Sequence, residues 1–461
     1  MFSKVNKNKK GFITIITMAL VILAASAFGV LIDCNVGQLH PVSSDSWETY
    51  AVRPQEGNGG EADPFKISSA QELAYLIDNL GSGSWFIELV ADIDLKEHNW
   101  TPIKCKANNI VNFNGNGHFI TNLVINHISN DRVGFFAGAS DNYTNQLNIK
   151  NLSFYSVNVS GKGLVGGLAG MAMGSSEINN VHIKSGSVTG LSLSAGGLVA
   201  YSTAKIKDCS NSSNVTMKNY NSGGQCGGII GYGAGGTLIG CVNSGTVLGL
   251  KSCGGVVGEF YGTEIKDCIN TGTVINRGNY YVGGLAGALG AAPKVDNCYV
   301  ECTIVLLGEN VDNQVGGLVG VVSSTEGVNI KNSGFNGRIV MTNSPYSINS
   351  LVGIVVNTNL KLENCFAVAE IDINEASLEV SPYGFTVDKT DCSNCYSYTK
   401  INTVEGNKEH RKYKGTDFSG FAYSQDINGG FPFPKSMYAV GEFIENELSV
   451  LEYLQLNGFS A

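Results

Sequence analysis

The sequence predicts an all-β chain that winds into a right-handed parallel β-helix, a solenoid of about eight to nine coils with short helical caps. Three observations support this fold class. A glycine-rich phrase returns about every thirty residues, a second phrase with a small polar residue at its third position keeps the same period, and no helical periodicity separates the copies. A fixed period of this size is typical of stacked repeats, in which each coil buries its apolar side chains against the next.

The first phrase reads Gly-Gly-Leu-Val-Gly or a close variant. Its copies begin at Gly166, Gly196, Gly227, Gly254, Gly283 and Gly316, and diverged copies begin at Val133 and Asn349. Successive copies are 27 to 33 residues apart. A β-propeller is the main alternative, but its repeats are about 40 residues long and carry a Trp-Asp signature that this chain lacks. The spacing therefore favours one coil per repeat.

The second phrase consists of an apolar residue, a spacer, a small polar residue and a second apolar residue, as in Ile265-Lys266-Asp267-Cys268. Because Gly, Asn and Asp adopt the left-handed backbone region most readily, the third position predicts a corner between two strands. Such a bend lets the residues on both sides of it point inward. The predicted corner column is Asn151, Asn180, Asp208, Gly240, Asp267, Asn297, Asn332, Asn364 and Asn394.

Three predicted core columns follow from this register. The column before the corner is Ile149, Ile178, Ile206, Leu238, Ile265, Val295, Ile330 and Leu362. The column after it is Leu152, Val181, Cys209, Cys241, Cys268, Cys298, Ser333, Cys365 and Cys395. The third lies within the glycine phrase and is Phe135, Leu168, Leu198, Ile229, Val256, Leu285, Leu318 and Leu351.

The N-terminal residues 1–27 predict an export signal or a membrane anchor. Four lysines precede an uncharged apolar run from Gly11 to Ile32. A secretory signal cleaved after Ala27 is one interpretation, and a single membrane anchor over residues 11–32 is another. A third is a site that resembles that of type IV prepilins, cut after Gly11, although Ile16 stands where that family has an acidic residue. All three interpretations place the rest of the chain outside the cytoplasm.

The remaining segments are expected in a simple order. Residues 28–60 predict a linker, 61–130 an N-terminal capping segment, 131–400 the repeats, and 401–461 a closing segment and tail. Ser69 and Glu72 form a capping box for a helix whose apolar face includes Leu73, Leu76, Ile77 and Leu80. This helix should cover the first coil, where strand edges would otherwise be exposed. Val440 to Leu456 has helical spacing and is either a second cap or a frayed tail.

Both phrases and their flanks resemble the GLUG repeat of bacterial surface and secreted proteins. Ahead of the repeats, Asp63 to Ile67, Asp92 to Leu95 and Phe113 to Ile120 follow the order seen at the start of GLUG arrays. Behind them, Phe421 to Pro434 resembles the closing segment. The resemblance covers roughly residues 57–434. It implies an extracytoplasmic, surface-associated parallel β-helix and implies no reaction.

The cysteines are interpreted as core residues. The chain has twelve cysteines, and most of them share repeat positions. Cys226 and Cys253 occupy one position, and five cysteines occupy the column after the corner, joined there by Cys395 after the last full copy. Parallel stacking aims neighbouring side chains in the same direction, which is unfavourable for disulfide geometry. We therefore expect buried, reduced thiols that act as small hydrophobes. Cys392 and Cys395 have redox-motif spacing but flank a predicted corner, and a structural role is expected for them as well.

No motif predicts catalysis. The six histidines form no His-Glu-x-x-His zinc motif, and Gly-x-Ser-x-Gly and phosphate-loop lysine motifs do not stand out. The coil surfaces are expected to be mostly Ser, Asn, Thr and Gly. Asp92 and Asp94 are close enough to suggest a glycosidase pair, but their place in the capping segment favours a structural role. We therefore predict no enzyme, and no catalytic, cofactor-binding or metal-binding residue.

Composition agrees with a non-catalytic surface protein. The chain has 59 Gly in 461 residues and only 15% charged residues, which suits a β-helix with many corners. Its net charge of -9 argues against nucleic acid as a partner. One position predicts an exposed apolar stripe if that face is not covered. It follows the third residue of each glycine phrase and holds Ala169, Val199, Ile230, Val257, Ala286 and Val319.

These features predict an adhesin-like protein that binds a host or cell-envelope partner, an unidentified protein or glycan, through this stripe or through the loops. The alternatives are a passive spacer, a polysaccharide-processing lyase or hydrolase, and a pilin-like component of a surface appendage.

Overall fold

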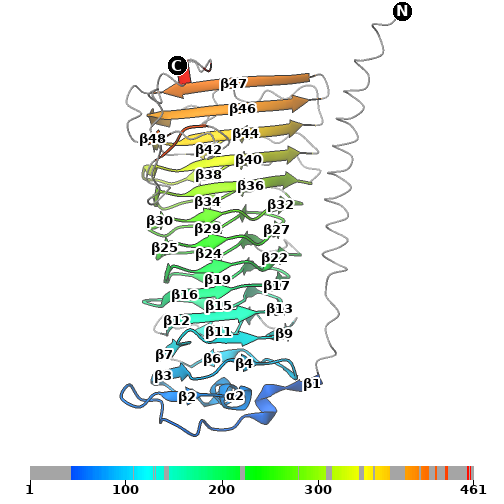
Figure 1. The fold of residues 1–461 in the computed structure, drawn as a ribbon, viewed down its shortest axis with the longest axis vertical. Coiled ribbons are helices and arrows are strands. Elements are labelled where there is room, and N and C mark those ends of the chain that lie inside the picture. The colour runs from blue at the N-terminus through cyan, green and yellow to red at the C-terminus, as the bar shows by residue number, and fades with distance from the viewer. Residues whose placement is uncertain are drawn as a thin grey trace, which may run out of the picture. The chain divides into compact units, whose positions relative to one another are not determined.

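The computed structural model describes residues 43–106, 108–127, 129, 131–139, 145–218, 224–278, 280–307, 314–341, 347–356, 359–373, 390–403, 406–414, 421–422, 431–434, 454–455 and 457. The chain divides into two compact units, Met1–Ser44 and Asp45–Ala461. The second unit is nearly all β and forms a parallel β-solenoid of about nine turns with minor helical caps, which confirms the predicted fold class. Figure 1 shows its coils stacked in chain order, from blue to orange.

Two sheets flank the glycine phrase, and each takes one strand per coil. The eight-stranded sheet contains β10 (Arg132–Val133), β14 (Leu164–Gly166), β18 (Ser194–Gly196), β23 (Gln225–Gly227), β28 (Cys253–Gly254), β33 (Tyr281–Gly283), β37 (Gln314–Gly316) and β41 (Ser347–Asn349). The nine-stranded sheet contains β6 (Ile103–Cys105), β11 (Phe136–Ala139), β15 (Ala169–Ala172), β19 (Val199–Ser202), β24 (Ile230–Gly233), β29 (Val257–Phe260), β34 (Ala286–Leu289), β38 (Val319–Ser323) and β42 (Val352–Val356).

The largest sheet has 28 strands and bends at the predicted corner. Ahead of the corner lie β2 (Phe65–Ile67), β3 (Gly83–Leu89), β7 (Asn109–Asn114), β20 (Lys205–Lys207), β25 (Thr237–Ile239), β30 (Glu264–Lys266), β35 (Lys294–Asp296), β39 (Val328–Lys331), β43 (Leu360–Glu363) and β45 (Thr390–Ser393). Two strands, β12 (Gln146–Tyr155) and β16 (Glu177–Ile183), run through it.

Beyond the corner, the same sheet continues with β4 (Ile93–Asp94), β8 (Phe119–Thr121), β9 (Val124–His127), β13 (Val157–Gly161), β17 (Gly186–Gly190), β21 (Ser210–Asn211), β22 (Asn214–Met217), β26 (Val242–Asn243), β27 (Val247–Gly249), β31 (Ile269–Asn270), β32 (Val274–Asn276), β36 (Tyr299–Leu306), β40 (Gly334–Met341), β44 (Phe366–Ile373) and β46 (Cys395–Thr403). Its last strand, β47 (Gly406–Lys414), is antiparallel to β46.

The corner column adopts the left-handed backbone conformation along the whole stack. All nine predicted positions have φ between 47° and 63°. Side chains link successive corners: Asn180 Nδ2 donates to Asn151 Oδ1 at 2.9 Å, and Asn364 Nδ2 donates to Asn332 Oδ1 at 3.1 Å. The polar residue at the corner therefore has two functions, since it permits the bend and it bonds neighbouring coils.

A second asparagine ladder, which was not expected from the sequence, lies inside the solenoid. Asn211, Asn243 and Asn270 are fully buried. Asn211 Nδ2 donates to Asn243 Oδ1 at 3.0 Å, and Asn243 Nδ2 donates to Asn270 Oδ1 at 2.8 Å. Each amide also donates to the backbone carbonyl two residues further on, at 2.9 Å. Because these donors are satisfied, the ladder fixes the register of the coils instead of destabilising the core.

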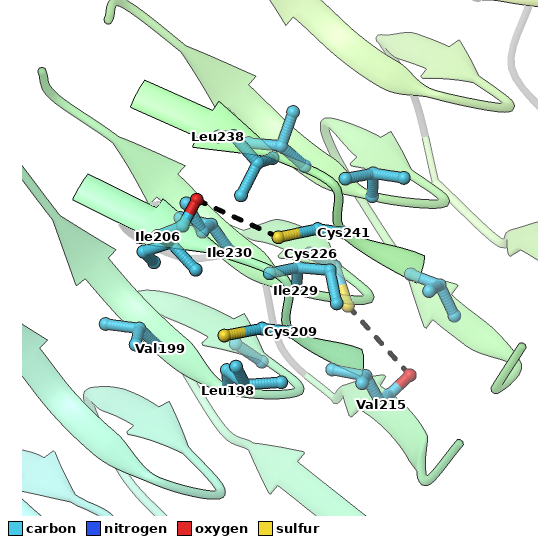
Figure 2. Packing of buried hydrophobic residues seen from close by; sticks show 14 of the residues in the cluster. Leu198, Val199, Ile206, Cys209, Val215, Cys226, Ile229, Ile230, Leu238 and Cys241 are labelled. Carbon is cyan, nitrogen blue, oxygen red and sulfur yellow. Dashed lines mark hydrogen bonds between the residues drawn. The ribbon is translucent and has the colours of Figure 1, made fainter. Parts of the chain in front are cut away.

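The three predicted core columns are buried. Figure 2 shows part of them, with Ile206 and Leu238 ahead of the corner and Cys209 and Cys241 after it. These side chains are at most 1% exposed. Stacking identical positions in adjacent coils thus gives one continuous apolar core.

The predicted exposed apolar stripe is wrong. Ala169, Val199, Ile230, Val257, Ala286 and Val319 are all at most 1% exposed. The chain turns within the glycine phrase: the backbone N–H groups of Leu198 and Val199 both donate to the carbonyl of Ile229, each at 3.1 Å. This turn resets the strand alternation, and so two consecutive side chains point into the core.

The last glycine of the phrase is required by close backbone contact. A Cβ atom on Gly258 would lie 2.5 Å from the carbonyl oxygen of Gly231 and 2.7 Å from the backbone nitrogen of Cys226. No side chain fits there without moving the backbone of the preceding coil.

The predicted N-terminal capping helix is present as α2 (Ala70–Asn79), which lies at the blue end of the stack in Figure 1. Ser69 Oγ accepts a hydrogen bond from the backbone N–H of Glu72 at 3.3 Å. In return the Glu72 carboxylate accepts from the backbone N–H and the hydroxyl of Ser68, both at 2.8 Å. Leu73, Leu76 and the rest of the predicted apolar face are buried.

Part of the predicted linker is packed against the first coils. The short 3-10 helix η1 (Trp47–Tyr50) follows strand β1 (Ser43–Ser46). Trp47 is 3% exposed, and its indole N–H donates to the carbonyl of Leu95 at 3.1 Å, close to strand β5 (His98–Asn99). The capping structure therefore begins before residue 61, because this tryptophan adds apolar surface that covers the end of the core.

The far end of the stack is closed by β47, whose sequence Gly-Asn-Lys-Glu-His-Arg-Lys-Tyr-Lys is strongly charged. Charged side chains on an edge strand hinder pairing with another chain. Strands β48 (Phe421–Ala422) and β49 (Phe433–Pro434) pair antiparallel within the predicted closing segment. Most of the predicted helix over Val440 to Leu456 and all of residues 1–42 lie outside the described residues. Within the described part of the chain, no helix is long and apolar enough to cross a membrane.

The corner geometry predicts unequal effects of two substitutions at Asn364. Asn364→Ala should destabilise the protein by about 2 kcal/mol, because alanine is strained at positive φ and the ladder hydrogen bonds are lost. Asn364→Gly loses the same hydrogen bonds without the strain and should cost about 1 kcal/mol less. Denaturant midpoints of the two variants check this difference, and equal losses would contradict the role of the left-handed backbone.

The capping box predicts a pH-dependent effect at Glu72. Burial tends to raise the pKa of Glu72, but hydrogen bonds from Ser68, Gln55 and Ser69 hold it below its usual value. The resulting stabilisation is present above the unfolded-state pKa and is lost as the pH falls through the folded-state pKa. Glu72→Gln should therefore lower stability by about 1 kcal/mol near neutral pH and have little effect in acid. Thermal unfolding of both proteins at several pH values measures this, and a gap that persists in acid would contradict it.

Candidate functional site

Four long strands near the C-terminal end of the stack carry charged side chains at matching positions. β36, β40, β44 and β46 are successive neighbours in the large sheet, as Figure 1 shows from yellow-green to orange. Their register aligns Thr303, Arg338, Glu370 and Lys400 in one row. A parallel row aligns Glu301, Asn336, Val368 and Tyr398. Because side chains alternate along a strand, both rows lie on the same, outer face.

A groove with a volume of about 560 Å³ lies over this face. We call it the charged groove. It is lined by Thr271, Thr273, Glu301, Cys302, Thr303, Asn336, Gly337, Arg338, Val368, Ala369, Glu370, Tyr398 and Lys400. Hydroxyl, amide, carboxylate, guanidinium and ammonium groups from five successive coils therefore converge on one surface.

The charges in the charged groove are paired across coils. Lys400 Nζ lies 3.0 Å from Glu370 Oε1. Asn402 Nδ2 donates to Glu370 Oε1 at 2.8 Å and to Asp372 Oδ1 at 2.7 Å. Arg338 Nε donates to the other oxygen of Asp372, which is only 4% exposed. Arg338, Glu370, Asp372, Lys400 and Asn402 thus form a connected network of two carboxylates, two cations and one amide.

This network favours the charged forms of its members. Burial opposes ionisation of Glu370, but hydrogen bonds from Asn402 and Lys400 lower its pKa below the usual value. The hydrogen bond to Glu370 raises the pKa of Lys400. Both groups are therefore ionised at neutral pH and act as fixed charges.

An aromatic wall closes the C-terminal side of the charged groove. The rings of Tyr398 and Phe431 are stacked with centroids 5.0 Å apart. The guanidinium of Arg411, on β47, lies 5.2 Å from the centroid of Tyr398. These contacts hold Tyr398 in place beside the polar row.

Asp92 and Asp94, the carboxylates considered as a glycosidase pair, make separate hydrogen bonds to the next coil. Asp92 accepts from the backbone N–H of Phe119 at 3.2 Å, and Asp94 accepts from Asn122 Nδ2 at 2.7 Å. Burial tends to raise the pKa of Asp94, but the Asn122 hydrogen bond lowers it overall. The two residues connect capping strands, as the structural interpretation expects.

A carboxyl group with a raised pKa is found at the opposite end of the stack. A hydrogen bond with Asp78 is the main cause of the raised pKa of Glu48. Both side chains belong to the N-terminal cap and are exposed to solvent.

The cysteines lie where the structural interpretation places them. The described cysteines are buried free thiols: Cys105, Cys209, Cys226, Cys241, Cys253, Cys268, Cys298, Cys302, Cys365, Cys392 and Cys395. Burial raises the pKa of the Cys253 thiol to about 12. A protonated, inaccessible thiol is a poor nucleophile and acts as a small apolar side chain.

The expectation of coil surfaces made mostly of Ser, Asn, Thr and Gly is wrong for the last coils. Arg338, Glu370 and Lys400 each stand six residues after a corner asparagine. The same position holds Thr273, Thr303 or other small residues in earlier coils. Aligning the surface positions on the corner column would have revealed this row, whereas composition averaged over all coils concealed it.

Comparison with known proteins supports the repeat assignment. The GLUG motif matches residues 278–305, which include one glycine phrase and one corner. The chain therefore carries a GLUG motif within a parallel β-solenoid. No curated protein matches the sequence. The crystal structure of a putative immunoglobulin A1 protease from Bacteroides ovatus is similar to it, with 19% identity, a TM-score of 0.40, and coverage of 83% of this chain and 95% of that chain.

The buried carboxylate Asp372 provides a stability test of the network. Arg338→Met removes its cationic partner and should destabilise the protein by about 3 kcal/mol, since the remaining charge is buried and unpaired. Adding Asp372→Asn removes that charge and should recover much of the loss. Denaturant unfolding of the single and double variants measures the coupling, and strictly additive losses would argue against the pair.

Proposed function

We propose that this protein is a non-enzymatic, extracytoplasmic binding protein of the adhesin type, secreted or held at a bacterial cell surface, and that the charged groove binds a glycan. The observation that carries the proposal is the convergence of paired charges, an amide and hydroxyls on an open face of adjacent coils. Each sugar hydroxyl both donates and accepts hydrogen bonds. The groove supplies acceptors on Glu301 and Glu370 and donors on Arg338 and Lys400.

The open shape of the site favours an extended ligand over a small metabolite. The lining residues come from strands of successive coils, and the face they form continues along the stack. A polymer lying across several coils can contact all of these rows at once, and many weak contacts then add to useful affinity.

The pKa shifts of the ionisable side chains in the groove favour binding over catalysis. Glycoside hydrolysis needs a carboxyl whose pKa is raised so that it can act as an acid. A lysine acting as a base needs a lowered pKa. Glu370 and Lys400 are shifted in the opposite directions. A polysaccharide-processing enzyme is the alternative, favoured only by the presence of acids and bases on one β-helix face.

The proposed location rests on the GLUG motif and on the apolar run from Gly11 to Ile32. A cleaved signal would release the protein, and a retained segment would anchor it to the membrane. A pilin-like appendage component is the third alternative, and the residue at Ile16 weighs against it.

A matched pair of lysine variants tests the proposed site. Lys400 and Lys205 each lie 3.0 Å from a glutamate of the adjacent coil, but only Lys400 lines the groove. On a glycan and matrix-protein array, Lys400→Ala should weaken the strongest signal about tenfold, the loss of one charged hydrogen bond, and Lys205→Ala should leave it unchanged.

Equal effects of the two variants, or no bound glycan, would contradict the assignment of the site. The same purified proteins are incubated with the bound glycan and with polyuronides. Sustained release of reducing ends or unsaturated products, lost in Glu370→Gln, would establish the enzyme alternative instead.

A further inference from the structure

The outer face of the nine-stranded sheet carries two stacked tyrosines that are followed in the same row by one acid. The register of β19, β24, β29 and β34 aligns Tyr201, Tyr232, Glu259 and Ala288. The rings of Tyr201 and Tyr232 are stacked at 5.3 Å, and Tyr261 packs on Tyr232 at 5.6 Å. Figure 1 shows these strands in successive coils near the middle of the stack. Glu259 therefore replaces an aromatic residue at the end of a tyrosine row.

Glu259 is a buried acid that forms no ion pair among the residues that the structure describes. The exposed fraction of Glu259 is 9%. Its Oε1 accepts a hydrogen bond from the hydroxyl of Ser252 at 2.5 Å. Within the described parts of the chain, no lysine, arginine or histidine forms an ion pair with it. Buried carboxylates are normally paired with a cation, because removing the charge from water is costly.

Three tyrosines from three successive coils lie close enough to this carboxylate to feel its charge. Tyr232 comes from the preceding coil, where it pairs with Glu259, and Tyr261 comes from the same coil. Tyr281 comes from the following coil and precedes Val282, which pairs with Cys253, the neighbour of the Ser252 that donates to Glu259. Burial raises the pKa of all three phenols, and the charge of Glu259 raises it further. Tyr261 remains 41% exposed, so solvent reaches the cluster at this ring.

A cation already contacts an aromatic ring beside this cluster. Lys251 Nζ lies 5.2 Å from the ring centroid of Tyr280, and the rings of Tyr280 and Tyr281 pack edge to face at 5.9 Å. Lys251 therefore contacts Tyr280 and forms no ion pair with Glu259. The patch attracts positive charge, and its buried acid is left for a cation from outside the chain.

We propose that Glu259, Tyr232, Tyr261 and Tyr281 form a binding site for an organic ammonium group, which we call the Glu259 site. Tyrosine faces attract ammonium groups, and the attraction is strongest where water is excluded. The carboxylate supplies the opposite charge. An alkylated ammonium group has a low desolvation cost and matches aromatic walls better than a small inorganic cation does.

The Glu259 site is independent of the charged groove. It lies on the nine-stranded sheet, whereas the groove lies on the large sheet and involves later coils. The inference therefore does not depend on the proposed glycan binding. The ammonium group can belong to a free small molecule or to a lysine side chain of a protein partner, and both share the chemistry that the site recognises.

Calorimetric titration of the purified protein tests the proposal. The probes are choline chloride, butylammonium chloride and a short lysine-containing peptide, at constant ionic strength. Choline should bind with a dissociation constant in the millimolar range or tighter. Binding of the peptide at least as tightly as choline identifies a partner side chain as the ligand source, and binding of choline alone identifies a small molecule.

Two variants and one control locate the binding. Glu259→Gln keeps the size of the side chain and should weaken choline about tenfold. Tyr281→Leu removes one wall and should weaken it by a similar factor. Glu264→Gln, on strand β30 of the same coil, should leave the affinity unchanged. Circular dichroism confirms that each variant is folded, and Glu259→Gln should melt no lower than the wild type, because it removes an unpaired buried charge.

The proposal fails if choline does not bind, if it binds equally well to Glu259→Gln and Tyr281→Leu, or if potassium displaces it at equal concentration. The last result would mean that the site accepts any monovalent cation and that the tyrosine walls contribute nothing.

Discussion

In-register hydrogen bonding between successive coils is the constraint on which the rest of this structure depends. Each strand pairs in parallel with the same segment of the next coil, about 4.8 Å away. A residue type at one repeat position therefore meets its own equivalent above and below. Whatever occupies a column must pack or bond well with copies of itself, and this requirement explains both the core and the polar ladders.

Apolar residues, asparagine and cysteine meet that requirement in different ways. Branched aliphatic side chains stack in the core without polar cost. Asparagine carries a donor and an acceptor on one side chain, so a column of asparagines can bond along the stack, as Asn211, Asn243 and Asn270 do. Cysteine is small, and its thiol donates weakly to a backbone carbonyl, as Cys268 does to that of Leu238 at 3.5 Å. Charge is the exception, because like charges in one column repel.

The two candidate sites arise where this rule is broken. In the charged groove, the sign of the charge alternates along the row, and so Arg338, Glu370 and Lys400 coexist in adjacent coils. At Glu259 a single acid follows two stacked tyrosines in one row and forms no ion pair within the described chain. A repeat scaffold makes such departures conspicuous, because every other coil shows what the regular residue would be.

The sequence by itself determined the period, the corners and most of the core. The glycine phrase and the asparagine column are local signals, since positive φ and close backbone contact select Gly, Asn or Asp whatever the surroundings. The capping helix followed equally from Ser69, Glu72 and the spacing of its leucines. These features need only short-range geometry.

Only the tertiary structure decided which surfaces are exposed and which side chains meet. The turn at Leu198 and Val199 buried a stripe that strand alternation would have left outside. One bend changes which side chains of the following strand point inward and which point outward. Arg338, Glu370 and Lys400 share one offset from the corner, but only the folded coils show that their charges pair and that Asp372 and Asn402 join them. For the same reason the tyrosines around Glu259, which come from three coils, carry no signal in the linear sequence.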